Sequence, residues 1–452
     1  MDNRQQDFFF SEIASLDFPA RLPDTLYEIQ QNFEHSNITD VNIEIRKAFQ
    51  RSSILESLPK GSTVAVGVGS RGISNIPLIV KTVIDIFKEA GAKPFVIPSM
   101  GSHGSGIAEG QVELLAELGI TPEAIGAEIK ATMEVFQIGT LENGPNLYMD
   151  VNAFKADATF IIGRVKPHTD FFAELESGLS KMCVIGLGKR TGAEAMHAYG
   201  AKGFRNFLAP ATRIYEKNTN LLGGLAILEN AFSETSELMV LSSAQIGTKA
   251  EKDLLVKARE LMASLPFKEI DILVLKEIGK NISGTGMDTN VIGRLMIPRE
   301  TEPTNGPDIS VIGVLNVTEE SHGNASGMGL ANVTTLRLAN QIDWRSTYTN
   351  AITTSTFGMQ RVSVPIMMSN DEKALQVLSR GCGVPADKSR WVFANNTSKL
   401  GRLWVSKNML MDIESNPRLG IIDEIPLAFD NLGNMISPWS MGEVDQFRGK
   451  VI

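Results

Sequence analysis

Segments with the patterns of strands and helices alternate along the first half of this chain, and this alternation limits the fold more than any other feature. The strand-like run TVAVGVG precedes a helical stripe, and the strand-like run KPFVIPSM precedes the helical segment AEGQVELLAELGI. In the stripe, apolar residues recur at helical spacing, with Asn75 as the expected cap, Pro77 in the first turn and Gly91 as the stop. This order predicts an α/β fold with a parallel, Rossmann-like sheet, in which functional groups gather on loops at the carboxyl ends of the strands.

The same pattern continues along the chain and breaks near Pro266, where a proline with polar neighbours separates two regular segments. Before the break we expect strands near 158–163, 222–228 and 237–242 and helices near 190–198, 204–217 and 249–263. After it we expect strands from about 271 and near 309–316, 361–368 and 390–394, with a helix at 371–379. The second half is compatible with α/β or α+β. We predict an N-terminal parallel-sheet domain (1–266), a smaller α/β C-terminal domain (267–452) and an active site in the cleft between them.

Composition restricts the class of partner. The chain has 452 residues, 43% of them hydrophobic, and a net charge of −9 without any Lys/Arg-rich run, which argues against nucleic acid as a partner. No apolar stretch approaches the roughly 20 residues of a bilayer crossing, and the start MDNRQQDFFF lacks the order of a signal peptide. We therefore expect a cytoplasmic protein that acts on a small molecule away from membranes. Its oligomeric state stays open, with a homo-oligomer as one option.

The turn after the first strand combines a glycine motif with an arginine. Gly67, Gly69 and Gly72 spell G-x-G-x-x-G between a strand and a helix, as in dinucleotide-binding proteins. The acidic residue that such sites place at the end of the next strand is missing from residues 99–102, so the glycines fit a plain tight turn at least as well. Arg71 can grip a carboxylate or phosphate from this turn, or it can be an ordinary solvated loop residue.

Three histidines and one lysine form the second group of candidates. His103 and His168 follow strand-like segments, and imidazoles with pKa values near ~6.5 can exchange protons at neutral pH. Lys181 lies in a glycine-rich stretch, where an amine can act as a nucleophile or a covalent tether. His197, among small and apolar residues, fits a core histidine equally well when considered alone. If the fold gathered these four side chains, they would form a metal or proton-transfer site.

These strings resemble the nickel-dependent lactate racemase family. That family has a Pro-His pair, then Ser-Gly-Gly-x-Lys, then a histidine at a fixed interval, and here PHTDFF, GLSK and His197 follow in the same order. The SRG turn (Ser70, Arg71 and Gly72, preceded by Gly69) and the MGSHG loop look like the arginine-bearing and histidine-bearing strand ends of that family. The resemblance covers most of the N-terminal half and becomes less distinct beyond it.

The resemblance implies a cofactor and a role for each residue. The cofactor is the nickel pincer nucleotide, a pyridinium-3,5-bisthiocarboxylate mononucleotide that holds nickel (Ni) and that dedicated biosynthetic enzymes supply. By position, Lys181 would be its covalent tether and His197 the nickel ligand, while His103 and His168 would be the acid/base residues. Arg71 would anchor substrate or cofactor together with the turn residues Gly69, Ser70 and Gly72. The implied reaction is racemisation or epimerisation of a 2-hydroxy acid by reversible hydride transfer, which makes the chain an isomerase.

Several positions differ from the family pattern. Val68 replaces the aspartate that commonly stands three residues before the loop arginine. The segment from His168 to Lys181 is longer and carries Glu174 and Glu176, and Leu179 with Ser180 replaces Gly-x. We take these changes to indicate a pocket for a substrate larger or more polar than lactate.

In the second half, the polar stretch LKEIGKNISGTGMDTNVIGR looks like the lysine-bearing substrate or phosphate loop of the family. Lys280 is the predicted substrate-binding residue, and Asp288 is a less certain one. The sequence assigns no role to His322. Judged without the family, this stretch would be an ordinary surface loop.

Other functions stay open at this point. The chain could be an NAD(P)-dependent oxidoreductase that uses the glycine turn, or a non-catalytic nickel- or nucleotide-binding protein. A metal-free racemase with Cys183 and Cys382 as opposed bases is a weaker alternative. Neither cysteine lies in an obvious catalytic loop, and the two lack the paired spacing of thiolate metal sites.

Overall fold

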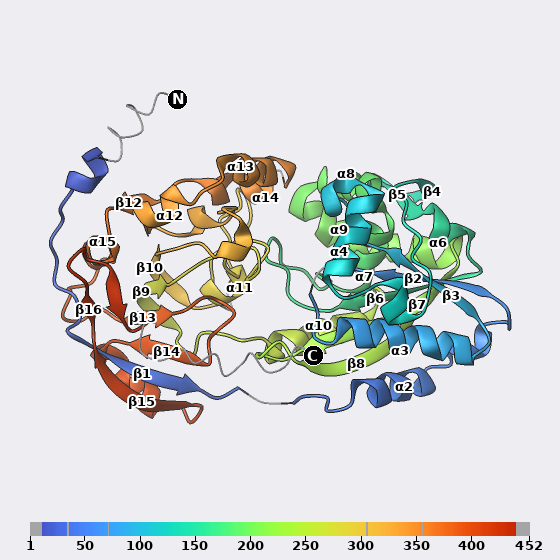
Figure 1. Ribbon diagram of the computed structural model, residues 1–452, viewed down its shortest axis with the longest axis horizontal. Helices are drawn as coiled ribbons and strands as arrows, with labels where there is room; N and C mark the ends of the chain where they lie inside the picture. The colour runs from blue at the N-terminus through green and yellow to red at the C-terminus, as the bar shows by residue number, and fades with distance from the viewer. Residues whose placement is uncertain (1–10, 34–35, 71, 304–305, 355, 440–452) are drawn as a thin grey trace. The chain divides into compact units, whose positions relative to one another are not determined.

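The computed structural model describes residues 11–33, 36–70, 72–303, 306–354 and 356–439 (Figure 1). The chain divides into two compact units, Glu34–Met262 and a composite unit of Met1–Phe33 with Ala263–Ile452. The break at Met262 lies close to the predicted boundary at residue 266. The predicted first domain starts at residue 1, whereas residues 11–33 of the described chain group with the composite unit.

The 34–262 unit is built around a five-stranded sheet in the order β3-β2-β6-β7-β8. The strands are β2 (Thr63–Val68), β3 (Lys93–Pro98), β6 (Ala158–Arg164), β7 (Leu221–Glu229) and β8 (Thr235–Ser242). The first four in sheet order run parallel, and β8 pairs antiparallel with β7. β2 has β3 on one side and β6 on the other, and ligands of open parallel sheets bind at such a reversal of strand order.

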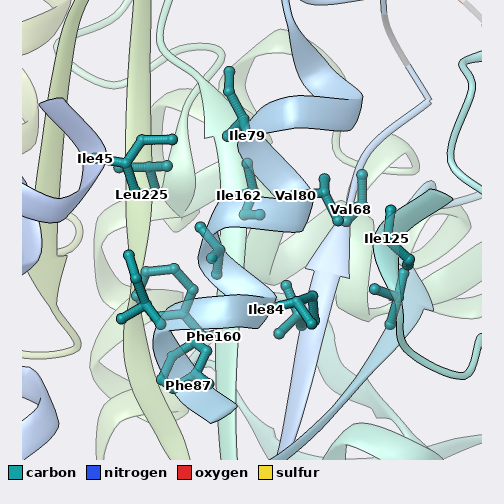
Figure 2. Close-up of a cluster of buried hydrophobic side chains, with 14 of the residues drawn as sticks. Ile45, Val68, Ile79, Val80, Ile84, Phe87, Ile125, Phe160, Ile162 and Leu225 are labelled. Atoms are coloured by element: carbon teal, nitrogen blue, oxygen red, sulfur yellow. The ribbon is translucent and has the colours of Figure 1, made fainter. Parts of the chain in front are cut away.

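Apolar runs without alternation explain why β2 and β6 lie inside this sheet. Both strands are almost entirely buried, as expected for parallel strands covered on both faces. On one face, Val68, Phe160 and Ile162 pack with residues of α2 (Val41–Arg51) and α3 (Ile76–Glu89), including Ile45, Ile79 and Phe87 (Figure 2). On the other face, a Cβ built on Gly163 would lie 2.8 Å from Met182 Cγ. A side chain at residue 163 would therefore displace the segment that follows Lys181.

Helices and a hairpin complete this unit. They are α4 (Ala108–Glu117), α5 (Pro122–Ile125), the hairpin β4 (Val135–Thr140) and β5 (Asn146–Asp150), α6 (Val151–Lys155), α7 (Leu179–Lys181), α8 (Lys189–His197), α9 (Gly200–Asn218) and α10 (Lys249–Leu261). A π-helical segment, η3 (Met182–Leu187), joins α7 to α8. The predicted helix α3 is confirmed, but its cap is not. Asn75 is left-handed (φ 61°) and its side chain makes no capping hydrogen bond.

The composite unit contains an eight-stranded mixed sheet in the order β12-β11-β10-β9-β13-β14-β1-β15. Its strands are β9 (Glu269–Leu275), β10 (Asp308–Val314), β11 (Val333–Thr335), β12 (Ile366–Met368), β13 (Trp391–Ala394), β14 (Arg402–Val405), β1 (Thr25–Gln31) and β15 (Leu419–Pro426). β9 to β13 run parallel, whereas β1 pairs antiparallel with both β14 and β15. With α15 (Asp371–Gly381), this confirms the α/β class in both units.

The strand expected at residues 361–368 is shorter than predicted. Residues Gln360–Val362 form a 3₁₀ turn, and only Ile366–Met368 pair with β11. Pro365 lies directly before the strand and has no N–H to donate to a ladder. Among the described residues, no helix is both long and apolar enough to cross a membrane.

Candidate active site

His168 and Lys181 meet at the carboxyl end of β6. Lys181 Nζ lies 2.5 Å from His168 Nε2, although thirteen residues separate them along the chain. The backbone N–H of Asp170 donates to His168 Nδ1 at 3.0 Å. In the neutral ring the proton then lies on Nε2, opposite the lysine nitrogen. A free amine can accept that proton in a hydrogen bond, and a free amine is also the nucleophilic form of lysine.

His197, the last residue of α8, is the third member of this group. Its Nδ1 donates to the Ala193 carbonyl at 2.6 Å, so the neutral ring keeps its lone pair on Nε2. The Phe204 ring lies 5.0 Å from the His197 ring and 6.5 Å from the His168 ring. Burial lowers the pKa of His197, the Ala193 hydrogen bond opposes the shift, and the charge of Lys181 lowers the pKa further. The neutral imidazole with an unprotonated Nε2 is the form in which histidine binds metals.

His103 lies on the neighbouring loop, after β3. Its Nδ1 is 2.5 Å from the hydroxyl oxygen of Ser70, which follows β2. Both loops adjoin the segment after Lys181. A Cβ built on Gly69 would lie 3.5 Å from Met182 Sδ, and one on Gly101 would lie 3.0 Å from Ile185. The structure therefore brings the loops of His103 and Ser70 to the same end of the sheet as Lys181.

The glycine motif allows close packing within the sheet and does not form the start of a helix. Gly67 is inside β2, and a Cβ there would lie 2.6 Å from Ser99 Oγ, so this glycine permits the close approach of β3. Gly72 is exposed and well before the first residue of α3, Ile76, with open space around its Cα. This geometry favours the tight-turn interpretation over a dinucleotide fingerprint. Arg71, predicted to be an anchor, lies outside the described residues.

Glu176 was not assigned a role from the sequence, yet it holds the His168 loop in place. Its buried carboxylate accepts hydrogen bonds from the backbone N–H groups of His168 (2.6 Å) and Ala173 (2.9 Å) and from the Arg259 guanidinium (2.6 Å). Burial raises the pKa of Glu176, while these three donors oppose the shift. A charge this deep is stable only with such partners, so Glu176 and Arg259 fix the backbone that carries His168.

Glu251 holds the segment that carries Lys181 in place in a similar way. From α10, its carboxylate accepts hydrogen bonds from Ser180 N (2.9 Å), Ser180 Oγ (2.5 Å) and Gly247 N (2.8 Å). A Cβ on Gly178 would lie 2.4 Å from Glu251 Oε1, so only glycine admits this carboxylate. The available signal in the sequence was an acidic residue on the buried face of α10, beside Leu254 and Leu255.

We expect Glu176→Gln to loosen the His168 loop. The amide offers one acceptor oxygen, and its NH₂ group faces N–H donors, so at least one hydrogen bond to the loop is lost. The free energy of unfolding should fall by about 1–3 kcal/mol, the usual cost of an unsatisfied buried group. Urea unfolding measures this cost. Glu174→Gln, on the exposed neighbour, is the matched control and should change stability by less than about 1 kcal/mol. Equal stability of Glu176→Gln and wild type would contradict the anchoring role.

The remaining candidates belong to the composite unit. Lys280, on the loop after β9, donates to the Gly284 carbonyl (2.6 Å) of the same loop and to Asn350 Oδ1 (2.5 Å) on the helix α13 (Trp344–Thr353). Asp288 caps the short helix α11 (Thr289–Ile292) through Asn290 N, which is a structural role. His322 is a left-handed residue (φ 46°) that ends a 3₁₀ turn.

Burial argues against the two cysteines as a pair of bases. Cys183 is in the 34–262 unit and Cys382 in the composite unit, and both are buried. Burial raises the pKa of Cys183 well above its usual value, and the charge of Glu251 raises it further. This environment disfavours the Cys183 thiolate. Among the described residues, no three His, Cys, Asp or Glu side chains are grouped so that they could hold a metal ion by themselves.

Comparison with solved structures shows the fold of this chain. The lactate racemase apoprotein from Thermoanaerobacterium thermosaccharolyticum superposes with a TM-score of 0.51 at 15% identity, over 83% of this chain and 99% of that one. A Thermotoga maritima protein from a structural genomics programme gives a TM-score of 0.52 at 12% identity, over 82% and 99%. No family model and no curated protein matches the sequence. The chain therefore shares its architecture with a lactate racemase.

Proposed function

We propose that this protein is a racemase or epimerase of a 2-hydroxy acid larger or more polar than lactate. The observation that carries the proposal is the grouping of His168, Lys181 and His197 at the carboxyl end of β6, with the His103 loop beside them. The fold shared with a lactate racemase apoprotein supports it.

The residues present fit a tethered nickel pincer nucleotide. Lys181 offers an amine for a covalent link, and the tautomer of His197 offers one unprotonated imidazole nitrogen for nickel. The other donor atoms would belong to the cofactor, so no cysteine cluster is required. When bound, this group would supply a hydride acceptor for the C2–H bond of the substrate.

The histidines supply the proton chemistry. A C2–H bond beside an ionised carboxylate is too weakly acidic for imidazole to break directly, whereas the hydroxyl proton is within reach of a base with a reference pKa near ~6.5. His103 and His168 are the candidates for the proton-transfer groups, and His168 in the tautomer described above holds its proton on Nε2. Racemisation passes through a planar 2-oxo acid, and each enantiomer presents its hydroxyl proton differently. Two histidines from two loops can therefore serve the two directions of the reaction.

The longer His168 loop supports a substrate different from lactate. Residues 170–176 carry two glutamates, and Glu176 fixes the shape of the loop from inside. Lys280 is a further candidate for binding the substrate. Its ammonium donates to the side chain of Asn350, which is a neutral amide. The runner-up function is an NAD(P)-dependent oxidoreductase, which the position of Gly72 relative to α3 disfavours.

A single preparation tests the proposal. The chain is produced together with the enzymes that make the cofactor, and a sample made without them is the control. We expect an increased intact mass, nickel close to one per chain and loss of optical purity in a panel of enantiopure 2-hydroxy acids. Reversible binding of free NAD without a mass increase would instead identify the oxidoreductase. Bound nickel with every acid left enantiopure would identify a carrier protein.

A further inference from the structure

Lys189 is a fully buried lysine that the proposed chemistry does not use. It is the first residue of α8, the helix that ends in His197, and it is left-handed (φ 54°). Its exposed fraction is 0%. A lysine is rarely found so deep unless it is paired, and a left-handed backbone is strained for any residue other than glycine. A lysine that is both fully buried and left-handed must be stabilised by specific partners nearby.

Three acceptors surround the Lys189 ammonium. Nζ donates to the Pro98 carbonyl at 2.6 Å and to Gln111 Oε1 at 2.9 Å, and it lies 3.2 Å from Asp150 Oδ2. An ammonium has three N–H donors, so these partners match its capacity. Burial lowers the pKa of Lys189 and raises that of Asp150, and each charge opposes the shift of the other. The pair is therefore maintained by mutual contact.

Two of these acceptors, Pro98 and Gln111, lie at the two ends of the His103 loop. Pro98 is the last residue of β3, directly before the loop. Gln111, on α4 after the loop, is also fully buried, and its Nε2 donates to the carbonyls of Gly101 (3.0 Å) and His103 (3.2 Å). The third acceptor, Asp150, ends β5 and caps α6 through Asn152 N. One ammonium thus joins both ends of the His103 loop to the start of the His197 helix.

We propose that Lys189 is a positioning residue that fixes the His103 loop relative to the helix carrying His197 and to the segment carrying Lys181. It acts through Gln111 and the Pro98 carbonyl and has no exposed atom with which to touch a substrate. The meaning of this link for catalysis rests on the proposed function. The link itself is a property of the apoprotein, so it can be tested without cofactor.

The test follows His103 directly. The chain has only five histidines, so their ring Cε1–H signals can be resolved in a correlation spectrum of protein labelled at histidine. We use Lys189→Met combined with Asp150→Asn, which removes both buried charges, and Gln111→Met, which leaves the Lys189–Asp150 pair intact. Both proteins should show a shifted and broadened His103 signal and an altered His103 titration. The His322 signal, from the composite unit, should stay unchanged.

A matched control separates positioning from general loss of stability. Arg337→Met with Asp371→Asn removes a partly buried ion pair (2.7 Å) in the composite unit. It should lower the melting temperature and leave the His103 signal as in wild type. If Lys189→Met/Asp150→Asn does not fold, Gln111→Met alone decides. A His103 signal identical to wild type in any folded variant that lacks Lys189 or Gln111 overturns the proposal.

Activity gives a second readout once the cofactor is loaded. A reacting group displaced by about 1 Å costs on the order of 10²-fold in rate, so Gln111→Met should lower kcat about that much and change KM little. Wild-type kcat in Gln111→Met would count against the inference. A wild-type protein that racemises nothing while His103 moves in the variants would refute the proposed function and leave the positioning role standing.

Discussion

Replacing Lys181 with alanine should give a folded protein that gains no mass when it is produced with the cofactor's biosynthetic enzymes, and racemisation should fall to background. The reason is chemical, because alanine offers no amine for a covalent link. The contact with His168 Nε2 contributes one hydrogen bond, so the free energy of unfolding should fall by only about 1 kcal/mol. Intact mass spectrometry with a thermal melt measures both quantities.

Lys166→Ala is the control for this experiment. Lys166 precedes His168 on the same loop, where its backbone N–H donates to the Ser177 carbonyl, and this contact survives the substitution. That variant should gain the same mass as wild type. A mass increase in Lys181→Ala would remove Lys181 from the proposed site and leave the cofactor attached elsewhere or held without a covalent bond.

His197→Ala should lose nickel while keeping its fold. His197 is the candidate whose hydrogen bond from Nδ1 to the Ala193 carbonyl leaves Nε2 as the unprotonated nitrogen of a partly buried ring. Elemental analysis after gel filtration should show nickel far below the wild-type content, even when the mass of the tethered nucleotide is present. His322→Ala, which alters a turn in the composite unit, should retain wild-type nickel. Unchanged metal in His197→Ala would disprove the ligand assignment.

The pH dependence of nickel retention has a defined sign. A proton and a metal compete for the same nitrogen, so a histidine loses its metal as falling pH protonates that nitrogen, whose reference pKa is about 6.5. Burial lowers the pKa of His197, which weakens the competing proton. The midpoint pH of nickel release should therefore be lower than for a histidine with the reference pKa. Dialysis against buffers of falling pH measures the midpoint, and a midpoint at or above pH 6.5 would contradict the neutral, partly buried ring.

Local patterns in the sequence predicted much of the 34–262 unit. The stripe of α3 and the unbroken apolar runs of β2 and β6 identified their elements correctly, because those residues are buried on the faces that their spacing indicates. The same logic placed His103 and His168 after strands. It failed for β1, whose Leu26 and Ile29 are buried between mostly polar neighbours, since its partners β14 and β15 lie far along the chain.

The buried charged residues that hold the site loops in place could not be predicted in this way. Glu176, Glu251 and Lys189 are charged residues, and sequence reasoning assigns such residues to the surface by default. Their burial depends on donors and acceptors from distant segments, such as Arg259 for Glu176 and Pro98 for Lys189. These long-range contacts leave no periodic pattern in the sequence, although they hold the loops of the candidate site in place.

The composite unit also sets an order for biosynthesis. β1 is made first, but its two neighbours in the sheet, β14 and β15, emerge only after residue 400. During translation the whole 34–262 unit can collapse around its own sheet while the earliest strand still waits for its partners. A chain truncated after residue 262 should therefore contain a protease-resistant 34–262 unit with an unpaired, cleavable β1 segment before it, a state that the finished protein no longer contains.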